Sequence, residues 1–225
     1  MALAEPWGMT MATVMHIDHL LTLTQWLSPA YPVGAFAWSH GLERAIQRGD
    51  VIDADTLADW LRVVLEHGAG RSDAILLCAA HAADDVAPIA DLAAVLAPSR
   101  ERRMETMQQG AAFAATTRAV WGLDLPDMAY PVAVGRAAGL IGVPVLPTAQ
   151  VWLQCFVSNL VQAAQRLMPL GQTKGQRILM ALSPVCTAVG GAAAEAGIDD
   201  IGSASFTVDI ASMQHADQSP RIFRS

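Results

Sequence analysis

Apolar residues recur at helical spacing along most of the chain. The clearest stretch runs from Asp53 to about Ala83. Its apolar residues follow the i, i+3, i+4, i+7, i+8 spacing of an amphipathic helix, and they are Leu57, Trp60, Leu61, Val64 and Leu65. Asp53 or Asp55 can cap the first turn by accepting from its free amides. Gly68 and Gly70 are placed to break or bend this helix before it continues.

Similar patterns, with prolines near helix starts and glycines near helix ends, predict further helices. They cover 16–27, a short stretch between Pro88 and Pro98, 100–118 with Ser99 as N-cap, 126–142, 147–168 and 173–196. Another helix is expected to open at about Ser39, and 206–213 reads as a short helix or an extended segment. Runs of β-branched residues in strict alternation are absent from the sequence.

The chain has no internal repeat and no linker long enough to separate two domains. We therefore expect an all-α, single-domain, bundle-like fold of about seven to ten helices. Residues 1–12 are expected to form a flexible N-terminal tail, 13–205 the helical domain, and 206–225 a C-terminal tail that binds a partner.

The predicted helix over 147–168 carries an uncharged polar stripe opposite an apolar one. The polar stripe is Gln150, Gln154, Ser158, Gln162 and Gln165, and the apolar stripe is Trp152, Phe156, Leu160, Ala163 and Leu167. Neutral amides lose their hydration at lower cost than charges do. The stripe therefore suits a helix–helix or subunit interface, and the alternative is an ordinary solvated face.

The composition indicates that this protein hides part of its surface. Charged residues make up 16% of the 225 positions and hydrophobic ones 53%, against about 25% charged in a typical soluble domain. A membrane, a homo-oligomer or a partner protein would cover such a surface. The net charge of −7 argues against nucleic acid, which favours a basic face.

Two uncharged stretches, 137–165 and 178–194, test the membrane alternative. Both contain proline, the first is rich in glutamine, and the second falls short of the ~20 apolar residues of a span. The N-terminal residues show neither the basic region nor the apolar run of a signal peptide. Three scattered cysteines without a CxxC pattern read as free thiols in a reducing compartment. We therefore expect a protein of a reducing compartment, with no membrane segment.

Candidate catalytic chemistry is sparse. His16 and His19 lie three residues apart, so with Asp18 they could begin a metal site, and a small helical metal-dependent hydrolase is the alternative function. The sequence shows no further ligands converging on them. Neither a GxSxG motif nor a GxxxxGK[ST] loop is present. The expectation is a protein with no catalytic residues, no resident metal and no cofactor.

Two segments instead carry contact chemistry. The segment 28–43, SPAYPVGAFAWSHGLE, combines prolines, glycines and three large aromatic residues, so it reads as a shaped, packed loop. It could be a plain helix–helix connection or a functional surface. At the other end, Arg221 and Arg224 flank Ile222 and Phe223. Arginine and aromatic residues dominate interface energies, so this tail is predicted to order on a partner, the alternative being a frayed terminus.

Four motifs in order resemble the UreF family of urease accessory proteins. They are 28–43, the segment 99–110 (SRERRMETMQQG), the segment 167–177 (LMPLGQTKGQR) and the end 215–225 (HADQSPRIFRS). In the second motif several arginines surround Glu105, and internal pairing is the simplest interpretation. The fourth departs from the family pattern at Ala216, Ser219 and Pro220.

The resemblance implies a non-catalytic, all-helical, homodimeric protein of the cytoplasm. It would act with a UreD/UreH-type accessory protein and a UreG-type GTPase on apo-urease, in GTP-dependent nickel insertion. The family's tail orders against the UreD/UreH-type protein. Carried over position by position, the implied partner-binding residues are Ser28, Pro29, Pro32, Gly34, Phe36, Ser39, Gly41, Glu43, Arg166, Gln172, Arg177, His215, Arg221, Phe223, Arg224 and Ser225.

Overall fold

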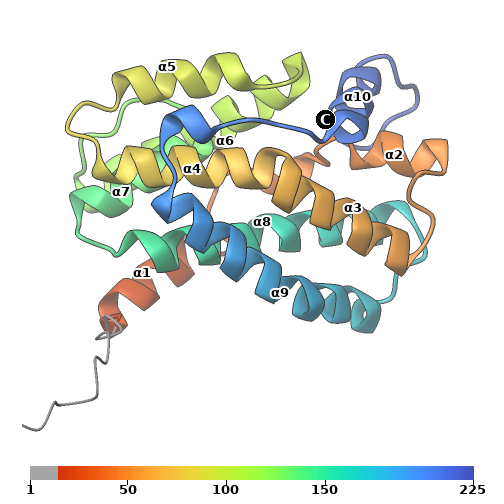
Figure 1. Cartoon of the computed structure of the whole chain (residues 1–225), viewed down its shortest axis with the longest axis horizontal. Helices are drawn as coiled ribbons and strands as arrows, with labels where there is room; N and C mark the ends of the chain where they lie inside the picture. The colour runs from red at the N-terminus through yellow and green to blue at the C-terminus, as the bar shows by residue number, and fades with distance from the viewer. Residues whose placement is uncertain (1–14) are drawn as a thin grey trace, which may run out of the picture.

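The computed structural model describes residues 15–225, and these residues form helices joined by short loops (Figure 1). In chain order the helices are α1 (Ile17–Trp26), η1 (Ala35–Ala37), α2 (Leu42–Arg48), α3 (Ala54–His67), α4 (Ala69–Ala82), α5 (Ala87–Leu96), α6 (Arg100–Trp121), α7 (Tyr130–Leu140), α8 (Val145–Leu167), α9 (Gln172–Glu195), η2 (Ile198–Asp200) and α10 (Phe206–His215). Across 15–225 there is no strand, which confirms the all-α prediction. The predicted tail over 1–12 lies outside the described residues, and the division at 205 stays a prediction.

The long helix α8 lies at the centre of the bundle. It packs against α9, α4, α2, α7 and α3, and most of its side chains are at least half-buried. Trp152, Leu160 and Ala163 are buried, as their stripe predicts. From the polar stripe, Gln150 donates from Nε2 to the carbonyl of Thr187 on α9, at 3.2 Å. At this position the stripe therefore serves a helix–helix contact inside the chain.

Helices α4 and α7 pack closely side by side (Figure 1). The close approach depends on glycine. A Cβ atom at Gly135 would lie 2.1 Å from the carbonyl oxygen of Leu77, and one at Gly139 would lie 2.2 Å from that of His81. Real side chains do not tolerate such distances, so these two glycines set the spacing of the helix pair.

Local signals placed several helix ends correctly. The Asp53 side chain accepts from Thr56 N and the Ser99 hydroxyl from Arg102 N, so both N-caps are confirmed. The break between α3 and α4 falls at Gly68. Helix α8 begins at Val145, two residues before the predicted Pro147. Proline fits there because the first helical turn has free N–H groups and needs no donor from it.

Two predicted helix starts were too early. Helix α2 begins at Leu42 because His40 (φ 58°) and Gly41 (φ 76°) both take left-handed conformations just before it. Helix α7 begins at Tyr130 rather than at Pro126. The left-handed pair before α2 requires a tertiary reason, since histidine adopts such a φ uncommonly. That reason lies in the contact with the C-terminal tail.

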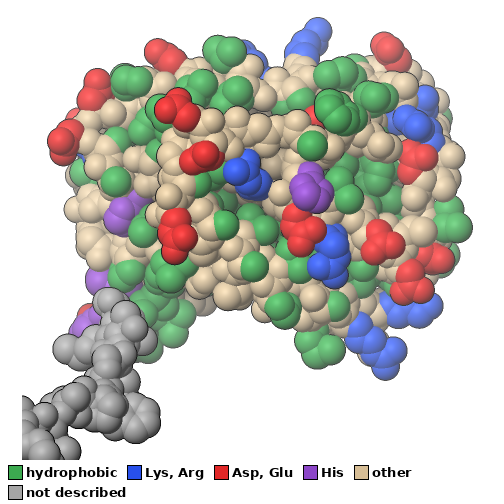
Figure 2. All heavy atoms as spheres, in the orientation of Figure 1, with side chains coloured by type: hydrophobic (Ala, Val, Ile, Leu, Met, Phe, Trp, Pro, Cys, Tyr) green, Lys and Arg blue, Asp and Glu red, His purple; other side chains and the backbone are tan. Residues whose placement is uncertain are grey.

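Helix α9 bears on the membrane alternative. It is 24 residues long and, among the described helices, it is the one long and apolar enough to cross a membrane by length and composition. This corrects the expectation that the stretch is too short. In the fold α9 packs along α8, α3 and α4. Core helices of soluble proteins pass the same test, and the apolar side chains on the face in Figure 2 are interspersed with charged ones.

Candidate functional site

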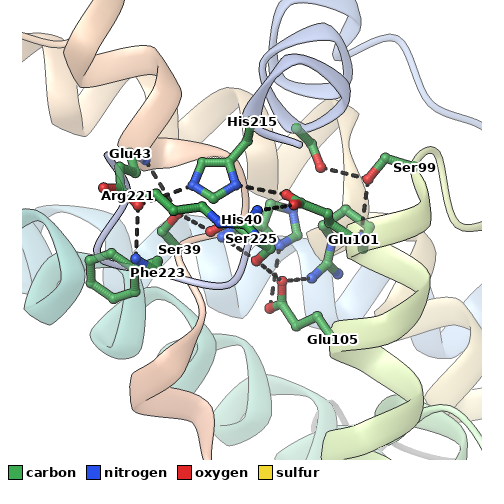
Figure 3. A network of polar contacts seen from close by, with 12 residues as sticks. Ser39, His40, Glu43, Ser99, Glu101, Glu105, His215, Arg221, Phe223 and Ser225 are labelled. Atoms are coloured by element: carbon green, nitrogen blue, oxygen red, sulfur yellow. Dashed lines mark hydrogen bonds and ion pairs between the residues drawn. The ribbon is translucent and has the colours of Figure 1, made fainter. Parts of the chain in front are cut away.

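The first and the last of the four motifs meet in space. Helix α10 packs on α2 and α6, and the chain after it turns back so that its final residues lie beside the 28–43 segment (Figure 3). The Glu43 carboxylate accepts from the backbone N–H groups of Ile222 (2.7 Å) and Phe223 (2.9 Å). A residue of the first motif therefore holds the backbone of the last one.

A buried histidine joins this contact to α6. The His215 side chain is fully buried between two carboxylates. Its Nε2 lies 3.0 Å from Glu43 Oε2 and its Nδ1 lies 2.7 Å from Glu101 Oε2. Arg221 donates from Nη1 to the other oxygen of Glu101, at 2.7 Å. Three segments far apart in sequence, α2, α6 and the tail, are thus tied by charged hydrogen bonds, which are the stronger kind.

Ser225 is held by the turn that precedes α2. Its carbonyl oxygen accepts from both the backbone N–H (2.9 Å) and the hydroxyl of Ser39. Its own hydroxyl donates to Glu105 Oε2 at 2.7 Å. Gly41 also lies tight against α10, where a Cβ would be 2.8 Å from Ser212 N. The left-handed turn at 40–41 therefore accommodates both the tail and α10.

Two arginines stack on aromatic rings at the outer edge of this contact. The Arg166 guanidinium lies 4.2 Å from the ring centre of Phe223, and it donates to the Phe36 carbonyl at 2.6 Å. The Arg224 guanidinium lies 4.7 Å from the ring centre of Trp38. Such cation–π contacts contribute about 0.5–2 kcal/mol each, depending on exposure. They fasten the tail to α8 and to the 28–43 loop.

A buried cluster of charged side chains lies between α6 and α4, next to the tail. Arg102 pairs with Glu105 at 2.5 Å and with Asp73 of α4 at 3.9 Å, which confirms internal pairing for this arginine. Burial raises the pKa of Asp73 to about 6, although Arg102 opposes this effect. Burial, together with the positive charge of Arg102, holds the pKa of His40 well below its ordinary value. His40 is therefore neutral at physiological pH.

The same cluster forms part of the wall of a cavity of about 400 Å³. The 28–38 loop covers one side of it and α6 and α8 the other, with Tyr31, Trp152 and Phe156 among its aromatic lining residues. A second cavity of about 120 Å³ shares Asp73 and Arg102 with the first. The loop is thus a shaped, packed element, as its composition predicts.

The structure brings most of the predicted partner-binding residues into one region. Those in direct contact there are Phe36, Ser39, Glu43, Arg166, His215, Arg221, Phe223, Arg224 and Ser225, while Gly41 forms the turn. Ser28, Pro29, Pro32 and Gly34 line the cavity nearby. Gln172 and Arg177 lie at the start of α9 with exposed side chains; Gln172 contacts Gln165, and neither joins the tail's hydrogen bonds within 15–225.

Burial separates two roles among these residues. Ser39, Glu43, His215, Phe223 and Ser225 are buried within the single chain, so in this arrangement they hold the tail rather than face a partner. Other side chains remain exposed, namely Pro29, Pro32, Phe36, Arg166, Arg221 and Arg224. The tail is already packed on its own chain, and its ordering on a partner stays a prediction.

Sequence reasoning left Glu101 and Glu105 out of the candidate site. Both belong to the 99–110 motif, and they lie one turn apart on α6, on the face that receives the tail. The signal was a cluster of charges at helical spacing inside a motif. It reads equally as a solvated face, and the deep burial of these charges depends on contacts with α10 and the tail.

The alternative metal site on α1 has little support. His16 caps α1 by accepting from Asp18 N and lies 3.1 Å from the Asp18 carboxylate, with both side chains exposed. Within residues 15–225, no group of three or more His, Cys, Asp or Glu side chains is arranged to hold a metal. The three cysteines are free, and burial raises the pKa of each thiol to about 11.

Comparison with known proteins supplies the family. The UreF family model matches residues 51–183. The chain belongs to the UreF family of urease accessory proteins. It is 50% identical to a urease accessory protein UreF of Roseobacter denitrificans over 218 residues, covering 96% of this chain and 98% of the relative. It is 52% identical to one from Cereibacter sphaeroides (92% and 98% covered) and 48% identical to one from Rhodopseudomonas palustris (92% and 91%). The chain therefore has a urease accessory role, and the hydrolase alternative is not favoured.

Proposed function

We propose that this UreF-family chain is a non-catalytic scaffold in nickel insertion into urease. It would bridge a UreD/UreH-type protein and a UreG-type GTPase on apo-urease, as a homodimer in the cytoplasm, and so support GTP-dependent assembly of the nickel centre. The family membership supports the accessory role. A scaffold needs accessible contact surface rather than a reaction centre.

The observation that carries the proposal is the exposed face of α10. Phe206, Ile210 and Met213 recur at i, i+4 and i+7, so they share one face of the helix. Their exposed fractions are 71%, 45% and 51%. Val208, Ala211 and His215 on the other face are buried against the body. An amphipathic helix that shows three large apolar side chains to solvent fits the groove of another protein.

The buried contacts of the tail explain how such a face could be presented rigidly. Glu43, Glu101 and Ser39 hold the tail at several points, and Ser212 of α10 lies 2.7 Å from the Ser99 hydroxyl at the start of α6. A preorganised surface loses less conformational entropy on binding than a flexible one does. We therefore assign the UreD/UreH-type contact to the exposed face of α10, together with Ile222 and the exposed arginines of the tail.

The test is co-purification with the UreD/UreH-type and UreG-type proteins, followed by size exclusion. A double variant, Phe206→Asp with Ile210→Asp, adds two charges to the exposed face of α10. Burying one unpaired charge at an interface costs several kcal/mol, so we expect the complex to be lost. Met180→Asp is the matched control, because Met180 is 73% exposed and lies on α9. That variant should co-purify like the unaltered chain.

Two results would count against the proposal. If the double variant and the control bind equally well, α10 is not the contact surface. If the unaltered chain binds neither accessory protein and does not increase nickel loading of apo-urease in their presence, the scaffold function itself is wrong. Circular dichroism of each variant shows whether the helical fold is retained.

A further inference from the structure

The cavity beneath the 28–38 loop has the size of a small-molecule site. Its volume is about 400 Å³, within the range of about 300–1,000 Å³ that ligand pockets occupy. Pro32, Phe36 and Gln162 belong to its lining and have exposed side chains, so the cavity opens to solvent between the loop and α8. The 28–43 motif therefore builds a feature that docking of the tail does not explain.

One part of the cavity wall is aromatic. Trp152 and Phe156 of α8 are stacked, with ring centres 5.5 Å apart and ring planes 4° apart. The ring of Tyr130, at the start of α7, lies 6.3 Å from that of Trp152, and Tyr31 contributes a further ring from the loop. Such a wall suits the apolar or aromatic body of a ligand, and the faces of aromatic rings attract cations.

Another part of the wall is acidic. Asp73 of α4 and Glu105 of α6 line the cavity beside one buried cation, Arg102. Glu105 pairs with Arg102 at 2.5 Å and accepts from the hydroxyl of Ser225 (Figure 3). Asp73 lies 3.9 Å from Arg102, beyond hydrogen-bonding distance, and this is the ion pair recorded for Asp73 within residues 15–225. Two carboxylates thus share one guanidinium group.

The charges of the lining leave this wall negative. Burial raises the pKa of Asp73 to about 6, with Arg102 opposing the effect and Glu105 adding to it, so the carboxyl is mostly ionised at neutral pH. The other arginine of the lining, Arg166, is held at the outer edge, where it stacks on Phe223 and donates to a loop carbonyl. The inner wall therefore favours a cationic group over an anionic one.

Arg102 supplies a second unmatched group in the same wall. Its residue is 6% exposed, and its Nε has no hydrogen-bond partner within residues 15–225. A buried N–H without an acceptor is destabilising. A ligand that offers a charged N–H to Asp73 and an oxygen to Arg102 would satisfy both groups.

We propose that the cavity binds a small organic amine, with its ammonium group at Asp73, a neighbouring hydroxyl or carbonyl oxygen at Arg102, and its apolar or aromatic body against Trp152 and Phe156. A metal cation fits less well, because no group of three or more His, Cys, Asp or Glu side chains in the described part of the chain is arranged to hold one. The inference concerns the isolated chain, and it stands or falls independently of the scaffold function.

Isothermal titration calorimetry of the full-length chain with phenylethanolamine, at about pH 7.5, tests the site. This probe carries an ammonium group, a hydroxyl on the next carbon and one aromatic ring. We expect a dissociation constant of about 1 mM or lower, which is within reach of a ligand of about ten heavy atoms. Phenylacetate has the same number of heavy atoms and the opposite charge, and it should bind at least about tenfold more weakly. Phenethylamine, which lacks the hydroxyl, should bind about fivefold more weakly.

Two substitutions probe the two parts of the wall. Asp73→Asn keeps the shape of the side chain and removes its charge, so it should weaken binding of phenylethanolamine by about tenfold to a hundredfold. Phe156→Leu removes one ring and should weaken this binding by about threefold or more. Asp91→Asn is the matched control, because Asp91 is exposed on α5 and is not part of the lining. Its affinity should equal that of the unaltered chain.

The proposal is wrong if phenylethanolamine does not bind, in which case the cavity holds water alone. It is equally wrong if phenylacetate binds as tightly, or if Asp73→Asn keeps the affinity within about twofold of the unaltered chain. Equal binding of phenethylamine would refute the contact with Arg102. Circular dichroism shows whether each variant folds. Should Asp73→Asn fail to fold, Phe156→Leu and the comparison of the two oppositely charged probes on the unaltered chain decide.

Discussion

Substitution of Glu43 by glutamine probes the link between the first motif and the tail. Glu43 has three donors directed at it: the N–H groups of Ile222 and Phe223 and the ring of His215. Glutamine has nearly the same shape but offers one acceptor oxygen, and its other terminal atom is a donor. In either orientation of the amide, at least one of the three donors faces another donor.

The cost can be worked from these contacts. A buried donor left without a partner costs about 1–3 kcal/mol, and each remaining hydrogen bond loses about 1 kcal/mol when its acceptor is no longer charged. The sum is about 3–5 kcal/mol, which agrees with the cost of breaking a buried ion pair. A loss of about 3 kcal/mol corresponds to roughly a hundredfold weaker docking of the tail.

Hydrogen exchange of 206–225 and thermal unfolding together measure this loss. We expect protection in the tail to fall by about a hundredfold, and the melting temperature to fall by several degrees insofar as the tail unfolds with the body. Glu66→Gln is the control, since Glu66 forms a partly exposed pair with Arg62 at 4.0 Å, and such pairs contribute about 0–1 kcal/mol. If the hydrogen-exchange protection of 206–225 in Glu43→Gln stays within about twofold of that in the unaltered protein, Glu43 does not hold the tail as proposed.

Two further predictions concern the body of the fold. Gly135→Ala should destabilise the protein by about 1–3 kcal/mol in urea unfolding, because its Cβ would lie 2.1 Å from the carbonyl oxygen of Leu77. Gly191→Ala should be neutral or stabilising, because nothing lies within 4 Å of its Cβ. Equal effects of the two substitutions would contradict the close packing of α4 and α7. Burial raises the pKa of Asp73 to about 6, above the ordinary aspartate value of 3.8. The unfolded state therefore releases its proton first, and the contribution of Asp73 to stability falls as pH rises from about 4 to about 6. Relative to the unaltered protein, the free energy of unfolding of Asp73→Asn should therefore rise by about 2 kcal/mol between about pH 4 and about pH 6. If the difference in unfolding free energy between the two proteins does not change with pH, this carboxyl does not titrate as stated.

The sequence predicted the parts of the fold that local chemistry controls. The stripe from Leu57 to Leu65 fixed α3 as an amphipathic helix, because burying one face requires apolar residues at helical spacing. Asp53 and Ser99 marked helix starts, since a short polar side chain can satisfy the free amides of a first turn. Gly68 marked a helix end. These signals depend on residues within a few positions of each other.

The candidate site was only partly accessible from the sequence. The motifs identified Ser39, Glu43, His215 and Phe223 as important residues, but they did not indicate that these residues contact one another. Glu43 and Phe223 are separated by 180 positions in the chain. No periodicity or capping rule acts over such a separation, so their pairing is a property of the folded bundle.

Tertiary contacts also decided which charged side chains are buried. On α6, Glu101 and Glu105 have the spacing of an ordinary solvated turn, yet both are buried because α10 and the tail cover that face. Helix α2 starts at Leu42 rather than at about Ser39, because His40 adopts a left-handed conformation where Ser225 and α10 pack against the turn. Local sequence thus determined the helices. Packing by distant segments determined which charged side chains are buried in the site. The desolvation penalty of a buried charge is offset only where its charged or hydrogen-bonding partners come together in the fold.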